Sequence, residues 1–156
     1  MISHKLTWGL RKVRARKRKP RVSVHYRAHK EIARVLVHEK LLYWNAVCQL
    51  SYKRVAIRNT KGNWGSCTSL KNLNFNYKIL FLPSHLQDYI VVHELCHLAE
   101  LNHGAQFWNL VAQYIPEYKE YIRQLKVIEK NGMKSMVLQN TNLLFVSGRE
   151  LTETVV

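Results

Sequence analysis

The sequence of 156 residues contains no apolar run that approaches the roughly 18 residues of a transmembrane helix. No apolar stretch of signal-peptide length follows the polar and basic first ten residues, so we expect no cleaved secretion signal. Cysteine is scarce, with only Cys48, Cys67 and Cys96. A small and odd number of cysteines does not form a disulfide framework. These absences favour a protein of the reducing cytoplasm.

Acidic residues are absent from positions 1–30, which contain 11 Lys and Arg. Positions 31–156 contain 14 Lys and Arg and 10 Asp and Glu, so the net charge of +15 belongs mainly to the N-terminal segment. Within residues 11–21, eight of eleven side chains are basic, and their mutual repulsion predicts an extended segment. This segment could contact nucleic acid, and the alternative is a solvated tail that aids solubility.

With 47% hydrophobic residues, the chain has enough apolar material for one core. We predict a basic N-terminal segment (1–28), a folded domain (29–131) and a C-terminal tail with a possible hairpin (132–156). Hydrophobic periodicity and turn residues predict helices over 29–50, 84–101, 105–114 and 116–130, and extended segments over 52–59, 64–67 and 73–82. This order predicts an α+β fold in which a small sheet packs against the helix over 84–101.

The most informative segment is an H-E-x-x-H motif whose histidines are His93 and His97. On a helix these two side chains lie one turn apart on the same face, where both imidazoles can bind one Zn²⁺. Glu94 lies beside that face and can act as a general base. His103 follows where Asn and Gly should end the helix, and a turn there would bring it back as the third ligand.

Several other interpretations of this region stay open. The third ligand could instead be a carboxylate some twenty residues further on, either Glu117 or Glu120. The whole motif could also be three ordinary surface histidines beside a solvated glutamate. Ser84 with Gln87 fits a capping box at the helix start, and Phe107 with Trp108 could anchor the turn that positions the third histidine.

Four segments, taken with their spacing, resemble the YgjP-like metallopeptidase family, which is similar to the SprT-like and WLM zincins. They are Trp64-Gly65-Ser66-Cys67, His93-Glu94-Leu95-Cys96-His97, Asn102-His103 and Phe107-Trp108. The similarity covers roughly residues 30–125. It implies a zincin-like α+β domain in which His93, His97 and His103 bind one zinc ion per chain and Glu94 is the catalytic base.

The leading hypothesis is a zinc-dependent metallopeptidase that hydrolyses peptide bonds through a metal-activated water, with Glu94 as general base. Its partner would be a peptide or protein substrate. One alternative is a metal-dependent nucleotide phosphohydrolase, since some relatives have been labelled nucleotide pyrophosphatases. Another is a nucleic-acid-associated zinc protein, or a protease recruited by the basic N-terminus. Tyr114, Tyr118 and Tyr121 are candidates for the group that stabilises an oxyanion.

Overall fold

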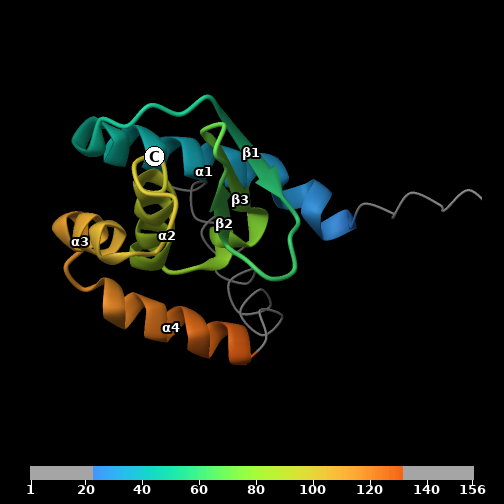
Figure 1. Ribbon diagram of the computed structural model, residues 1–156. Coiled ribbons are helices and arrows are strands. Elements are labelled where there is room, and N and C mark those ends of the chain that lie inside the picture. Colours follow the sequence, from blue (N-terminus) through green and yellow to red (C-terminus); the bar gives the residue numbers. More distant parts are fainter. Residues whose placement is uncertain (1–22, 132–156) are drawn as a thin grey trace, which may run out of the picture.

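The computed structural model describes residues 23–131, so the basic run at 11–21 and the predicted hairpin in 132–156 lie outside the described residues. The elements follow the chain in the order α1 (Val24–Cys48), β1 (Arg54–Arg58), β2 (Gly65–Cys67), β3 (Asn72–Asn76), the 3₁₀ helix η1 (Tyr77–Phe81), α2 (Ser84–Cys96), α3 (Ala105–Tyr114) and α4 (Tyr118–Lys130) (Figure 1). The predicted α+β class is confirmed. Within the described residues, no helix combines the length and apolar composition that crossing a membrane requires.

The three strands form one mixed sheet in the order β1-β3-β2, with β3 in the middle. β1 pairs with β3 in parallel, and β2 pairs with β3 antiparallel in the register Gly65↔Phe75. Side chains alternate between the faces of a strand. Ile57, Leu73 and Phe75 are therefore buried on one face, while Arg58 on the other face is exposed.

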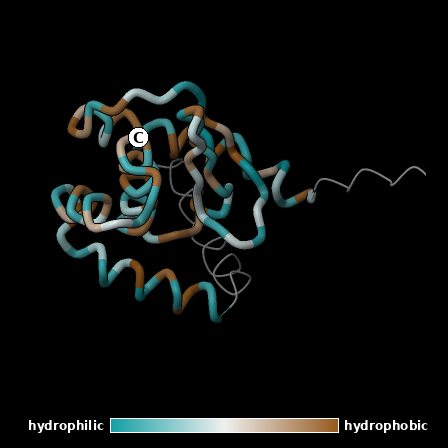
Figure 2. Tube along the Cα trace, viewed as in Figure 1, coloured by the Kyte–Doolittle hydropathy of each residue, from teal (hydrophilic) through white to brown (hydrophobic). Residues whose placement is uncertain are grey.

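The helix α2 lies in the middle of the molecule, between α1 and α4 (Figure 1). Nine of its 13 residues are buried, as expected for a helix that other elements surround. In contrast, hydrophobic and hydrophilic bands alternate along α4 (Figure 2), and only Leu125 of that helix is fully buried. The core is thus centred on α2, the helix that carries the H-E-x-x-H motif.

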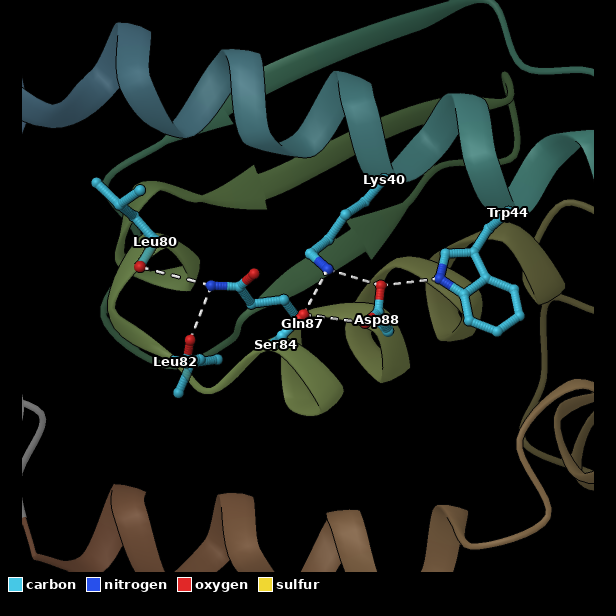
Figure 3. A network of polar contacts seen from close by, with 7 residues as sticks. All are labelled: Lys40, Trp44, Leu80, Leu82, Ser84, Gln87 and Asp88. Carbon is cyan, nitrogen blue, oxygen red and sulfur yellow. Dashed lines mark hydrogen bonds and ion pairs between the residues drawn. The ribbon is translucent and has the colours of Figure 1, made fainter.

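The predicted capping box at the start of α2 is wrong. The cap residue is Pro83, and no side chain caps this helix end. Gln87 turns instead toward the preceding segment, where its Nε2 donates to the carbonyl of Leu82 at 2.7 Å (Figure 3). The Ser84 hydroxyl contacts Asp88 one turn further along, at 3.4 Å. Tertiary partners have therefore replaced the local capping bonds.

Asp88 fixes α2 against α1. Its Oδ1 accepts hydrogen bonds from Lys40 Nζ at 2.8 Å and from Trp44 Nε1 at 2.9 Å (Figure 3). The Lys40–Asp88 ion pair is largely shielded from solvent, which strengthens it relative to an exposed pair. This network sets how α2, and therefore the motif, is oriented in the domain.

Two predicted boundaries also differ from the structure. α1 begins at Val24, five residues before the predicted start, and ends at Cys48 because Gln49 is left-handed with φ 53°. The apolar run after β3 forms η1 and does not extend the strand. Asn76 explains this change, since its Oδ1 accepts from Lys78 N at 3.2 Å and turns the chain into a 3₁₀ helix.

Candidate metal centre

The three predicted histidines converge on one point. His93 lies in the last turn of α2, His97 is the C-cap residue, and His103 lies in the turn before α3. Their possible ligand atoms all lie within 4.8 Å of one another, and the Nε2 atoms of His93 and His103 are 3.1 Å apart. The group contains neither of the rival carboxylates, Glu117 and Glu120.

The end of α2 makes this convergence possible. The regular helix ends at Cys96 and not near Leu101 as predicted. The next residues make hydrogen bonds between residues three apart, as in a 3₁₀ helix. These bonds join Leu98 N to Leu95 O at 2.9 Å and Ala99 N to Cys96 O at 3.1 Å. Because the helix ends early, the chain reverses direction before the third histidine.

Hydrogen bonds orient two of the imidazoles. His97 Nδ1 bonds to the backbone carbonyl of Glu100 at 3.0 Å, and His93 Nδ1 bonds to the Tyr89 hydroxyl at 3.3 Å. With Nδ1 occupied, Nε2 of each ring is the atom left to bind a metal. The sequence analysis missed Tyr89, although its position four residues before His93 on the same helix was a usable signal.

Aromatic rings pack against the histidines from α3. Phe107 stacks on His97 with ring centroids 4.4 Å apart, and Trp108 stacks on His103 at 5.4 Å. Tyr118, at the start of α4, stacks in turn on Trp108 at 5.2 Å. The prediction that the aromatic pair anchors the turn of the third histidine is confirmed. These contacts limit how far the imidazoles can rotate.

Glu94 points into a space that Gly65 of β2 leaves open. Its side chain is 4% exposed, and its buried Oε2 has no hydrogen-bond partner among the described residues. A Cβ atom added to Gly65 would lie 2.6 Å from Cγ and 2.7 Å from Cδ of Glu94. The carboxylate therefore fits only because residue 65 has no side chain. A buried carboxylate oxygen without a partner is a feature of catalytic and ion-binding sites, where a bound group supplies the missing contact.

Burial sets the protonation of the site. It raises the pKa of the Glu94 carboxyl to about 8. Burial, followed by the neighbouring His97 and His103, lowers the pKa of His93 to about 3. Burial likewise lowers the pKa of His97. Burial therefore favours the neutral form of His93 and His97, which is the form that binds a metal, and a bound cation would favour the ionised Glu94 carboxylate.

The histidines and Glu94 line a cleft of about 670 Å³. One wall is formed by residues 62–67, which include β2, and the other by α4, with Ile122, Leu125 and Lys126. Trp64 Nε1 donates to Glu129 Oε1 at 2.9 Å and joins the two walls. The volume is in the range of ligand-binding pockets.

A small mixed sheet, a central H-E-x-x-H helix and converging histidines place the domain in the zincin-like fold class of metallopeptidases. The chain belongs to the YgjP-like metallopeptidase family, whose domain matches residues 5–127.

Two solved structures share this fold, and both are metallopeptidase zymogens. Abylysin from Pyrococcus abyssi is 24% identical with a TM-score of 0.52, over 60% of this chain and 93% of that chain. Jannalysin from Methanocaldococcus jannaschii is also 24% identical with a TM-score of 0.51, over 62% of this chain and 97% of that chain. No curated protein matches the chain. At this level of identity, the two structures establish the fold alone.

Proposed function

We propose that this protein is a zinc-dependent metallopeptidase in which three histidines bind one zinc ion and Glu94 is the general base. The ligands are His93, His97 and His103. The observation that carries the proposal is that three imidazoles converge beside a buried carboxylate oxygen that has no partner among the described residues. The substrate is a peptide or protein segment that binds in the cleft.

The donor atoms suit zinc. Imidazole nitrogens are among its preferred ligands, and three protein ligands leave a fourth coordination position open, as in catalytic zinc sites. Nδ1 of His93 and Nδ1 of His97 are already hydrogen-bonded, so both rings present Nε2 to the centre of the group. The low pKa of His93 means that binding a cation displaces no proton from that ring at neutral pH.

When bound, zinc lowers the pKa of a water molecule and polarises a substrate carbonyl. Glu94 is positioned to hold the proton that this water loses on Oε2, and to deliver it to the leaving amine. Gly65 keeps the space beside the carboxylate clear. The stacked Phe107 and Trp108 hold the imidazoles in place, so that little reorganisation accompanies the reaction.

The lining of the cleft favours a peptide over a nucleotide. Among the described residues that line the cleft, Lys126 is the only Lys or Arg, and Glu94 and Glu129 oppose it. A triphosphate site needs several positive groups or a glycine-rich loop of backbone N–H donors, and this lining has neither. Apolar residues such as Trp64 and Leu125 instead offer contacts to the side chains of a peptide.

The test combines metal content with activity. Elemental mass spectrometry should find about one zinc per chain in the wild type and in Glu94→Gln, and much less in His103→Ala. Glu117→Gln is the matched control. It removes one carboxylate, as Glu94→Gln does, but at the position of a rival metal ligand. It should retain both zinc and activity.

Activity is measured on a fluorogenic peptide mixture, with nucleoside triphosphates tested in parallel. Loss of the general base should reduce peptide cleavage by roughly 10²- to 10⁴-fold. Full turnover in the zinc-loaded Glu94→Gln protein would contradict the role of the base. Hydrolysis of triphosphates without peptide cleavage would contradict the peptidase.

A further inference from the structure

Positive charge is concentrated in the part of the domain that forms the sheet. Residues 49–83 contain six Lys and Arg and no Asp or Glu. Residues 84–131, which form α2, α3 and α4, contain four Lys and Arg and six Asp and Glu. The positive charge of the domain therefore lies more in the segment that contains the strands than in the segment that contains the last three helices.

The alternation of the strands places basic and amide side chains on the sheet face opposite the core. We define this outer face by five residues: Arg54 and Arg58 of β1, Ser66 of β2, and Asn72 and Asn74 of β3. The cross-strand register brings them together, with Arg54 opposite Asn72 and Ser66 opposite Asn74. Arg54 and Arg58 are exposed and the other three residues are half-buried, whereas the alternate residues Ile57, Leu73 and Phe75 are buried in the core.

Hydrogen bonds hold part of this face in position. Arg58 Nε donates to Asn74 Oδ1 at 3.4 Å, and Asn74 Nδ2 donates to Ser66 Oγ at 3.3 Å. Among the described ion pairs, Arg34 and Arg123 have glutamate partners, whereas Arg54 and Arg58 have none. Their charge is therefore available to an external anion.

Two further lysines extend the face at one end. Lys53 N donates to Lys71 O at 2.8 Å, which places the two residues side by side next to the start of β1. At the other end, the Tyr26 hydroxyl donates to the carbonyl of Ile57 at 2.8 Å and fixes the first turn of α1 beside the end of β1. The basic run at 11–21 joins the described domain at Ser23, close to this contact.

We propose that the outer face binds the phosphate backbone of duplex nucleic acid without sequence preference. Arg, Lys, Asn and Ser side chains are the groups that contact phosphate and sugar oxygens in such complexes. Arg54 and Arg58 are separated by about 13 Å along the strand, which spans several phosphates of a duplex.

The composition of the face distinguishes this partner from other polyanions. The face has no aromatic side chain on which an unpaired base could stack, so it suits a duplex better than a single strand. Ala56, which lies between Arg54 and Arg58 on the same side of β1, is too small to insert into a membrane interface. Binding would therefore depend on phosphate contacts and on salt.

The test measures fluorescence anisotropy of a labelled 30-base-pair duplex with the full-length protein over a range of salt concentrations. The double variant Arg54→Gln/Arg58→Gln should lose two phosphate contacts. The slope of log K against log[salt] should then become shallower by about 1.8, and affinity at 0.1 M salt should fall roughly 50-fold. Arg54→Gln alone, at an exposed position, should show about half of the change in slope.

The matched control is Lys119→Gln/Arg123→Gln, which removes the same charge from two exposed residues of α4 that are also four positions apart in the sequence. It should change the slope little. Equal losses in the two double variants, or an unchanged slope in Arg54→Gln/Arg58→Gln, would overturn the proposal. So would a wild-type protein that binds phosphatidylserine vesicles, polyglutamate or a single strand more tightly than the duplex. Zinc content and peptide cleavage play no part in these measurements, so the outcome is independent of the proposed peptidase.

Discussion

Gly65→Ala is the substitution that most directly tests how the site is built. Ala adds only a methyl group, but that Cβ would lie 2.6 Å from Cγ and 2.7 Å from Cδ of Glu94. Ordinary contacts of this kind lie between 3.4 and 4 Å, so the carboxylate group must retreat by roughly 1 Å. The displaced group is the far end of a side chain, so the fold should accommodate the change.

The expected effect is on catalysis and not on metal binding. A displacement of about 1 Å of a catalytic group can cost roughly 10²-fold in rate, and complete loss of a general base costs roughly 10²- to 10⁴-fold. We therefore expect kcat for peptide cleavage to fall about 100-fold. Zinc content should not change, because the three atoms nearest to the added Cβ all belong to Glu94 and none belongs to a histidine.

The assay compares kcat and zinc content in Gly65→Ala and Gly62→Ala. Gly62 lines the same cleft, but a Cβ there would meet nothing within 4 Å, so this variant should behave as wild type. Normal turnover in Gly65→Ala, alongside an inactive Glu94→Gln, would refute the argument that the glycine makes room for the base. Loss of zinc in Gly65→Ala would refute it as well.

Two further predictions concern the surroundings of the site and the N-terminal end of α1. Tyr89→Phe removes the hydroxyl that bonds His93 Nδ1. Zinc affinity, measured by chelator competition, should therefore fall roughly 10- to 100-fold. An unchanged affinity would show that the hydroxyl does not orient the ring. Burial, followed by the charges of His29 and Lys78, lowers the pKa of His25 below its ordinary value of 6.5. Below pH 6.5 the unfolded chain therefore binds more protons at this residue than the folded chain does. The free energy of unfolding should accordingly decrease as the pH falls from 6.5. Between pH 7.5 and 5.5, His25→Gln should lose less in Tm than the wild type, and equal losses would contradict this assignment.

The geometry that sequence could predict is local. His93 and His97 are four residues apart on a helix, and this spacing fixes their common face whatever surrounds them. The third histidine could also be predicted, because it follows shortly after the predicted end of the helix. The structure brings these three together without Glu117 or Glu120. Tyr89 lies four residues before His93 on the same helix, so its contact with that histidine follows the same helical spacing. It was missed because tyrosines at helical spacing more often pack in a core.

The geometry that sequence could not predict depends on contacts between distant segments. Nothing near Gly65 in the chain indicates that it faces Glu94, since the contact requires β2 to pack on α2. The capping box failed for the same reason. Ser84 and Gln87 have the right spacing, but Gln87 reaches Leu82 and Ser84 bonds to Asp88, whose other oxygen binds α1. Local propensity was overridden by partners that only the folded chain supplies.

The register of β2 connects the candidate metal centre with the outer face. Side chains alternate, so a slip of one residue would turn Ser66 toward Glu94, where even a methyl group does not fit, and would remove it from Asn74. The turn between β2 and β3 fixes the register through Thr68 N to Asn72 O at 3.0 Å and a left-handed Lys71 with φ 58°. Errors in this turn would therefore disturb both faces of the sheet at once, although the turn contains none of the proposed zinc ligands.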